Sequence, residues 1–540
     1  MVVEQKSRKY VRTRAMTKIG KKYRWKWNKR KTIYLLILLI GIITRIFRFG
    51  ITPGGINQDE AFAAREAWSL LHFGVDSFGY HWPMYLTAWG SGMNVWNTIL
   101  MIPAIAIFGQ HTWVFRLPQL IVGITTLMAV EKIVKETIDE EVALWAMFLL
   151  AINPWHIMMS RWGLESNLAP GFLIFGLLFF IQGMKSEKYY LLSALFYGMS
   201  LYCYATIWPI VPFIVLFQAA YLLYVKKAQI TKWTISAGMI LGILAIPAIL
   251  FLLVNKGVIA EIVTPCFSVP KLVVMRDSEI TLMELGEKLE NMVSILVTEN
   301  DGYCWNSTDK FGLYYKYFLI FAVIGLLYCI RSVYRSLKNR IYDGYVLIGI
   351  QFLTAFALGT LIDVNVNRIN CIHISIIIFM AVGICRTLNL LRRDLKYITE
   401  VAVIALCALF LFFEKFYFGV YAKDIGRIFQ DGIENAVYRA QELSDDGDTI
   451  YVGEGIMYPK ILAFSTLSPT EYMETVEYTN YPDAFLDISQ CGNFVFNTPL
   501  EGNDGIYIID LTKQTESCVD MGYTVEQFGN MAVVYKLYVK

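Results

Sequence analysis

The stretch GGINQDEA, residues 54–61, places two adjacent acids, Asp59 and Glu60, just behind a hydrophobic run over residues 32–48. An acidic pair at the head of a long loop contributes little to a stable fold. At the boundary between water and lipid it can hold a general base. The interpretation of this pair therefore depends on whether the hydrophobic runs around it cross a membrane.

The composition is typical of a membrane protein. The chain has 540 residues, of which 56% are hydrophobic and 17% charged, and its mean hydropathy is +0.47. Soluble domains carry about a quarter charged residues. The 15% of aromatic residues suits interfacial Trp and Tyr anchors. We expect a polytopic α-helical membrane protein with no nucleic-acid partner.

About 20 apolar helical residues are needed to cross a bilayer. This length predicts about 11 spans, at 32–48, 117–134, 141–153, 168–184, 189–206, 208–225, 234–254, 314–331, 344–362, 371–389 and 398–415. There is a twelfth apolar run, 93–109. If it also crossed the membrane, the short basic connectors between the later spans would not fall on the cytoplasmic side. This run is therefore predicted to lie in the outer interface.

Charge asymmetry predicts the orientation. Residues 1–31 hold 13 Lys/Arg and one acid, whereas residues 416–540 hold 7 Lys/Arg and 19 Asp/Glu. Because Lys and Arg stay cytoplasmic, 1–31 is predicted to be a cytoplasmic tail of a plasma-membrane protein. The membrane domain covers 32–415, with external loops 49–116, 153–167, 255–313 and 363–370.

Residues 416–540 are predicted to form a small extracytoplasmic α/β domain. A helix-like stretch, 425–443, precedes strand-like runs at 449–452, 494–496, 505–510 and 531–539, with turn signals between them. Its Cys491 and Cys518 can pair. The cysteines show no metal-ligand spacing.

The polar residues that can carry chemistry fall on the predicted outer side. Besides Asp59 and Glu60 these are Arg116, Arg161, Glu165 and Arg368. Arg161 and Glu165, four residues apart, would share a helix face and can pair. Carboxylates can deprotonate a hydroxyl or bind a metal, and arginines can grip a phosphate. This combination favours group transfer from a lipid phosphate carrier.

Each of these residues also has a simpler interpretation. Asp59 can cap a helix, Arg116 can be an interface anchor, Arg161 and Glu165 can be a surface pair, and Arg368 can have an ordinary interfacial role. The remaining candidates are His81, His156, Tyr202 and Tyr204. They can equally be packing residues or aromatic residues of the membrane interface.

Taken in order, these pieces resemble the GT-C superfamily of polyprenyl-phosphate-dependent glycosyltransferases. The similarity is to the branch of protein O-mannosyltransferases and lipid A aminoarabinose transferases. It covers about residues 45–225, through Asp59-Glu60-Ala61, Gly79-Tyr80-His81-Trp82-Pro83, Phe115-Arg116-Leu117-Pro118, Asn153-Pro154-Trp155-His156, Arg161, Glu165 and Tyr202-Cys203-Tyr204. The second half matches in layout only.

The resemblance implies a catalytic role for Asp59 as base, with Glu60 beside it and Glu165 as a further carboxylate. It implies substrate or phosphate contacts for Arg116, Arg161, Arg368, His81, Tyr202 and Tyr204. The implied donor is a polyprenyl-phosphate sugar in the membrane, transferred with inversion to an extracytoplasmic acceptor. Use of a divalent metal varies in the superfamily, and the chain shows no decisive ligand set.

Two other classes compete with a glycosyltransferase: a transporter or lipid flippase, and a non-catalytic envelope assembly factor. Transporters often show internal repeats and ionisable residues at mid-membrane, and neither feature is visible here. An assembly factor would not need acids and arginines from four separate loops. If Asp59, Arg161, Glu165 and Arg368 lined one cavity, the enzyme would be favoured.

Overall fold

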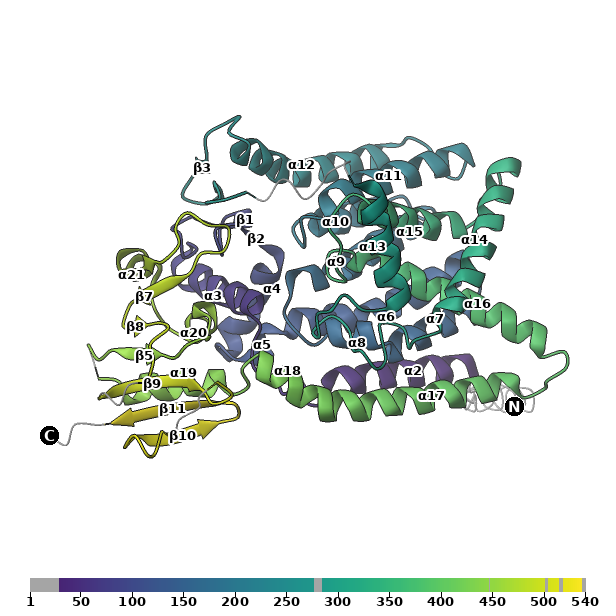
Figure 1. Ribbon diagram of the computed structural model, residues 1–540. Coiled ribbons are helices and arrows are strands. Elements are labelled where there is room, and N and C mark those ends of the chain that lie inside the picture. Colours follow the sequence, from purple (N-terminus) through teal and green to yellow (C-terminus); the bar gives the residue numbers. More distant parts are fainter. Residues whose placement is uncertain (1–28, 276–283, 446, 501–503, 514–517, 537–540) are drawn as a thin grey trace, which may run out of the picture.

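The computed structural model describes residues 29–275, 284–445, 447–500, 504–513 and 518–536. Most of the predicted basic tail, 1–31, lies outside the described residues. The described chain divides into a bundle of apolar helices and a sheet domain, with the first external loop between them (Figure 1).

Each of the eleven predicted hydrophobic runs coincides with a helix. These helices are α2 (Lys29–Ile46), α6 (Leu117–Thr137), α7 (Glu140–Ile152), α9 (Ala169–Gly183), α10 (Tyr189–Ser200), α11 (Ile207–Tyr224), α12 (Lys232–Asn255), α14 (Leu319–Asn339), α15 (Tyr345–Gly359), α16 (His373–Leu391) and α17 (Ile398–Phe416). Among the described residues, seven helical stretches are long and apolar enough to cross a membrane. The chain is thus a multi-pass membrane protein, and the count of eleven spans stays a prediction.

Helix α16 lies in the middle of the bundle, packed against α7 and α14. Glycine makes the close approach of α14 and α16 possible. A Cβ on Gly325 would lie 1.9 Å from the carbonyl oxygen of Phe379, and one on Gly383 would lie 2.0 Å from that of Phe321. Small residues at such crossings let helix backbones come together in a membrane.

The first external loop is an ordered subdomain. It contains α3 (Gln58–Phe73), the hairpin of β1 (Tyr85–Leu86) and β2 (Met93–Asn94), α4 (Trp96–Phe108) and α5 (Thr112–Phe115). Helix α4 covers most of the run predicted to lie in the interface. Its 13 residues rise only about 20 Å, less than the hydrocarbon core of about 30 Å, and it packs against α3.

Short elements fill the other predicted external loops. They are α8 (Pro154–Met159), η1 (Glu165–Asn167), β3 (Ile262–Val263), β4 (Ser268–Val269), α13 (Leu285–Thr298) and η2 (Asn370–Ile372).

A seven-stranded mixed sheet forms the C-terminal domain, with the strand order β10-β11-β9-β5-β8-β7-β6. The strands are β5 (Ile450–Val452), β6 (Glu477–Tyr478), β7 (Ile488–Cys491), β8 (Phe494–Val495), β9 (Gly505–Asp510), β10 (Thr524–Phe528) and β11 (Met531–Lys536). The helices are α18 (Ala422–Ile428), α19 (Ile433–Leu443), α20 (Tyr458–Leu462) and α21 (Pro469–Thr475). The predicted α/β domain is confirmed, and β6, β7 and β10 are additional to the predicted strands.

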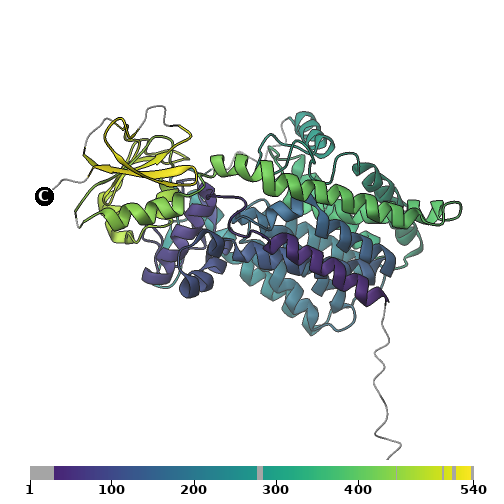
Figure 2. The same ribbon diagram turned by 90° about the horizontal axis from the view of Figure 1, so that it is seen from below.

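The helix predicted over 425–443 is broken at Gly432, which has φ +96°. A Cβ there would lie 1.8 Å from the carbonyl oxygen of Phe528, so the break lets β10 approach. On the other side, α18 continues α17 through a π-helical turn, Tyr417–Tyr421. This long helix runs along the bundle and ends at the sheet domain (Figure 2).

The sheet domain shares one hydrophobic core with the first external loop. Phe62 and Val114 from the loop cluster with Ile450 and Ile461 from the domain. Backbone bonds join the two parts, including Leu486 N to the carbonyl oxygen of Trp89 at 2.7 Å.

Cys491 and Cys518, whose pairing the sequence left open, are both free. Cys491 ends β7 near one edge of the sheet, whereas Cys518 precedes β10 at the opposite edge.

Candidate functional site

The N-terminus of α3 is fixed by its own cap. Asn57 lies in extended conformation, and its side chain accepts a bond of 2.9 Å from the backbone N–H of Asp59. This is the capping geometry typical of Asn. Asp59 and Glu60 thereby occupy the first helical turn and point in different directions. Asp59 is half-buried, whereas Glu60 is fully buried.

Glu60 and Arg116 form a buried bidentate ion pair, with 2.8 Å from Nε to Oε1 and 2.9 Å from Nη2 to Oε2. Arg116 also donates to the carbonyl oxygens of Pro53 and Gly55. Glu60 Oε1 accepts from the N–H of Gly163 at 2.7 Å. The pair therefore ties three segments together behind Asp59. In this geometry neither side chain is presented to a ligand.

Arg161 is similarly occupied. Its fully buried guanidinium donates to backbone carbonyl oxygens in the last turn of α2 and in the segment that follows it, namely those of Thr44, Arg45, Phe47, Arg48 and Thr52. The expectation that Arg161 and Glu165 share a helix face is wrong, because α8 ends at Met159 and Glu165 begins the separate turn η1.

A cavity of about 590 Å³ lies where the β1–β2 hairpin, η1, the start of α11, the end of α12 and the 363–370 loop meet. Three of the predicted site residues, Glu165, Tyr204 and Arg368, line it together with Lys256. A carboxylate and two cations thus converge from segments up to 203 positions apart in the chain.

The cavity is held in shape by the residues that line it. The N–H of Asn94 donates to Glu165 Oε2, and Arg368 Nη1 donates to the carbonyl oxygen of Asp363 at 2.9 Å. Ser91 Oγ and Asn94 Nδ2 also belong to lining residues. Both atoms are buried and have no hydrogen-bond partner among the described residues. Because buried polar groups are normally paired, these two atoms suit a polar ligand.

Asp59 is not among the described residues that line this cavity. Its Oδ1 accepts a bond of 3.1 Å from Trp89 Nε1. Trp89 belongs to the same β1–β2 connection as Ser91 and Gly92, which line the cavity. The structure thus brings together Glu165, Tyr204 and Arg368, and Trp89 links Asp59 to the β1–β2 connection that forms part of the same wall.

The other candidates lie elsewhere. The backbone of His81 pairs with that of Val75. Tyr202 donates to the carbonyl oxygen of Leu244 in α12 at 2.7 Å. His156 Nδ1 is 2.6 Å from Arg45 Nη2 in the bundle.

Lys256, Ser91 and Asn94 were not predicted. For Lys256 the sequence carries a signal that could have revealed it. This lysine follows the predicted span 234–254 on the side assigned outside, against the usual positive-inside bias. Ser91 and Asn94 had none, because small polar residues in a loop are common.

No group of three or more His, Cys, Asp or Glu side chains that could hold a metal occurs among the described residues.

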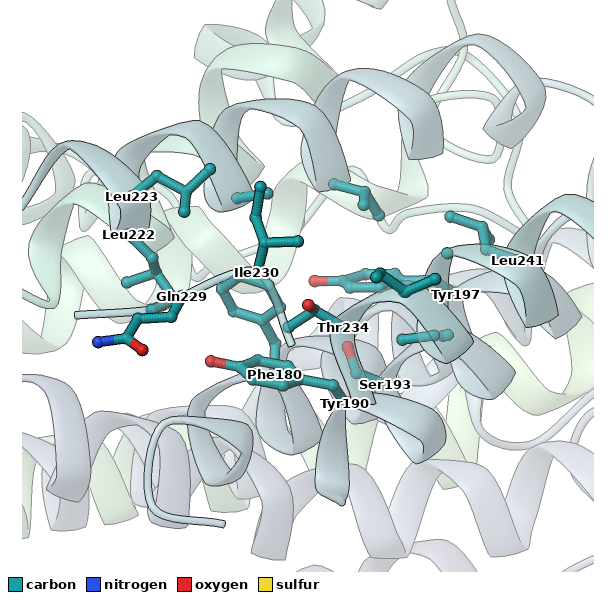
Figure 3. A pocket seen from close by; sticks show the side chains of 17 residues that line it. Phe180, Tyr190, Ser193, Tyr197, Leu222, Leu223, Gln229, Ile230, Thr234 and Leu241 are labelled. Carbon is teal, nitrogen blue, oxygen red and sulfur yellow. The ribbon is translucent and has the colours of Figure 1, made fainter. Parts of the chain in front are cut away.

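A second cavity, of about 340 Å³, lies between α10, α11 and α12 (Figure 3). Its wall is apolar apart from a few neutral polar side chains, such as Tyr190, Ser193, Gln229 and Thr234, and no carboxylate, lysine or arginine is among the described residues that line it. It therefore lacks the groups that a transfer reaction requires.

Known proteins share part of this sequence and its fold. A family model described as dolichyl-phosphate-mannose-protein mannosyltransferase matches residues 93–251. The structure is similar to that of ArnT from Cupriavidus metallidurans bound to undecaprenyl phosphate, with a TM-score of 0.53 and 8% identity over 94% of this chain and 98% of that one. The apo form of the same protein gives 0.51 and 10%, over 93% and 97%. The chain has the GT-C glycosyltransferase fold.

The oligosaccharyltransferase AglB from Archaeoglobus fulgidus, in complex with an inhibitory peptide and a dolichol-phosphate, is less similar, with a TM-score of 0.46 and 13% identity. The match covers 82% of this chain and 64% of the archaeal protein, so the chain spans less than two thirds of that length. A search of curated proteins gave no match. The GT-C resemblance predicted from the sequence is confirmed.

Proposed function

We propose that this protein transfers a sugar from a polyprenyl-phosphate carrier to a hydroxyl group of an extracytoplasmic acceptor, with inversion at the anomeric carbon. The observation that carries the proposal is the cavity in which Glu165, Arg368 and Lys256 converge. Asp59 is bonded to Trp89 of the β1–β2 connection, part of which lines this cavity. The GT-C fold and the family match over 93–251 support it.

In the proposed reaction, the acceptor oxygen attacks the anomeric carbon while the bond from that carbon to the phosphate oxygen breaks. The bonding electron pair leaves with the polyprenyl phosphate, and the acceptor proton passes to the Asp59 carboxylate. Arg368 and Lys256 would stabilise the charge that grows on the leaving phosphate. Ser91 Oγ and Asn94 Nδ2 would bond to oxygens of the sugar or phosphate.

Asp59 is proposed as the base because it stands on a rigid support. The Glu60–Arg116 pair and the Asn57 cap fix the backbone of its helical turn, and Trp89 orients its carboxylate. Preorganised groups of this kind are needed for proton transfer in a defined geometry. Glu165, which lines the cavity, would orient the substrate and is the second candidate base.

The acceptor would approach through a groove of about 500 Å³ that shares Leu272 with the cavity. Loop and sheet-domain residues build it together: Phe78, Tyr80, Thr87, Glu261, Lys271, Tyr478 and Tyr481. Thr87 Oγ1 is buried there without a hydrogen-bond partner among the described residues. Aromatic faces with a few polar groups are typical of binding grooves.

The test is transfer of labelled sugar in detergent from a panel of synthetic polyprenyl-phosphate sugars to envelope extracts. Asp59→Asn is nearly isosteric, so we expect an unchanged melting temperature and a fall in turnover of about 10²–10⁴-fold. The exposed Asp445→Asn in the sheet domain is the matched control and should transfer normally.

Glu165→Gln separates the two carboxylates. A Gln can still accept the bond from the Asn94 N–H, so a loss smaller than that of Asp59→Asn is expected. If Glu165→Gln is inactive while Asp59→Asn turns over normally, the base is Glu165. Normal turnover in both variants, and in Arg368→Gln, would show that this cavity is not the transfer site.

A further inference from the structure

A basic groove lies far from the proposed transfer site. It has a volume of about 880 Å³ and is bounded by the residues just before α14 and by the end of α17 with α18. The transfer cavity involves the end of α12, which runs along the opposite side of the bundle in Figure 1. The groove and the transfer cavity share none of their described lining residues.

Five cationic side chains line the groove: Lys310, Lys316, Lys415, Lys423 and Arg427. All five are exposed. The single carboxylate among the described lining residues is Asp424, whose Oδ1 is 3.8 Å from Arg427 Nη1. The groove is therefore strongly positive, although it adjoins a domain whose sequence carries a net charge of −12. It is complementary to an anion.

The rest of the wall is apolar and aromatic. Phe412 and Val420 are 67% and 59% exposed, and Tyr317 is 88% exposed. Lys310 Nζ lies 5.7 Å from the ring centres of Phe311 and Phe416. Such side chains on a membrane helix face lipid tails, whereas the cations lie where these helices end.

We propose that this groove binds one anionic phospholipid, with its phosphate headgroup among the five cations and its acyl chains along the apolar face of α17. The groove also lies at the depth of a lipid headgroup. Helix α14 begins at Leu319 and α17 ends at Phe416, so both helices reach the membrane boundary here. Cations at the predicted external end of spans run against the positive-inside bias, and a bound lipid phosphate accounts for them. A lipid here would brace the turn through which α17 continues into the sheet domain.

The experiment is titration of the purified full chain with phosphatidylglycerol, followed by native mass spectrometry. The test variant is Lys316→Gln/Lys415→Gln/Lys423→Gln. Each basic residue near a lipid surface contributes about 1 kcal/mol, so the variant should bind at least about tenfold more weakly. The control removes three lysines from the predicted opposite side, Lys185→Gln/Lys188→Gln/Lys226→Gln, and should bind within about twofold of wild type.

Three outcomes would overturn the proposal. The first is equal binding of phosphatidylglycerol by the test variant and wild type. The second is equal binding by wild type of phosphatidylcholine with the same chains, since that result would remove the charge requirement. The third is displacement of the lipid by millimolar inorganic phosphate, which would assign the groove to a soluble anion. If the triple variant is unstable, Lys423→Gln alone, with an exposed side chain, should show a smaller loss in the same direction.

Discussion

At the scale of the residue, Asp59 and Glu60 divide two tasks between neighbouring carboxylates. One turn of α3 sends Glu60 into the protein, where Arg116 and the Gly163 N–H bind it, and leaves Asp59 half-buried against Trp89. Acids adjacent in sequence point about 100° apart on a helix. The same turn can therefore anchor the loop and offer a base.

Because Asp59 and Glu60 have different tasks, the variants Asp59→Asn and Glu60→Gln should have opposite effects on stability and on turnover. Glu60→Gln leaves the Arg116 guanidinium buried without its counter-charge, and breaking a buried pair in this way costs about 3–5 kcal/mol. We expect a strongly lowered melting temperature in detergent, unlike Asp59→Asn. Glu140→Gln, which breaks an exposed pair with Lys135, is the control and should melt close to wild type. A normally stable Glu60→Gln would mean that the pair does not anchor the loop.

A second residue, Glu299, predicts a pH dependence. It is buried at the end of α13 and accepts a bond of 2.7 Å from the N–H of Tyr314, and burial raises its pKa from 4.5 to about 7. The folded state thus holds this proton more tightly than the unfolded chain. The contribution to stability is fully present below pH 4.5 and is lost as the pH rises through about 7.

Glu299→Gln should therefore flatten the decline in melting temperature between pH 4.5 and 7. Glu287→Gln, exposed on the same helix, should keep the wild-type profile. Parallel profiles for wild type and Glu299→Gln would refute the assignment.

The sequence named Glu165, Tyr204 and Arg368 as candidates for one site, and these three residues line one cavity. It could not distinguish them from Arg116 and Arg161. The sequence pattern is the same for an arginine that awaits a phosphate and for one that binds backbone carbonyl oxygens. That difference depends on the turns at 52–55 and 44–48, whose carbonyl directions no local pattern encodes.

At the scale of the element, α13 has three faces. Lys288, Met292 and Ile295 are buried against the protein. Glu287 and Glu290 are exposed. A third stripe is apolar and exposed to between 42% and 65%: Leu285, Leu289, Val293 and Val297. A helix with an unburied apolar stripe on a membrane protein is typical of an interfacial helix.

We therefore predict that the apolar stripe of α13 lies in the bilayer surface. Spin labels on Val293→Cys and Glu290→Cys, in a Cys266→Ser background, test this in reconstituted membranes. The label at 293 should be more accessible to oxygen than to a water-soluble nickel complex, and the label at 290 should show the reverse. Equal accessibility of both sites to the nickel complex would contradict the prediction.

Helix positions were predictable because apolar runs of this length have few alternatives. Elements inside the external loops were less predictable. Helix α13 follows from its amphipathic period, but the two-residue strands β1 to β4 carry no periodic signal. Tertiary contacts hold them instead. Tyr85 packs on Phe251 of α12, Leu486 N donates to the carbonyl oxygen of Trp89, and Ser268 pairs with Pro83.

At the scale of the whole molecule, the sheet domain and the first loop are one folded body. Their shared core means that removing residues after 416 would expose Phe62, Val114 and their neighbours and would unfold the loop that carries Asp59. The composition predicts that a C-terminal domain exists. It does not predict that this domain packs on the first loop, because that packing joins residues more than 300 positions apart. The acceptor groove depends on it, since Tyr478 and Tyr481 face Phe78 and Tyr80 there.

The orientation of the molecule is the last prediction. Charge asymmetry places the connector 386–396 in the cytoplasm and the loop 255–313 outside. Cys266, free and exposed in that loop, should react with a membrane-impermeant maleimide in intact cells. Arg393→Cys, exposed in the connector, should react in a Cys266→Ser background only after the membrane is permeabilised. Glu474→Cys, exposed in the sheet domain, should behave like Cys266.

If Arg393→Cys reacts in intact cells and Cys266 does not, the whole assignment of sides is inverted. The cavity, the acceptor groove and the sheet domain would then face the cytoplasm, where the proposed acceptor could not reach them.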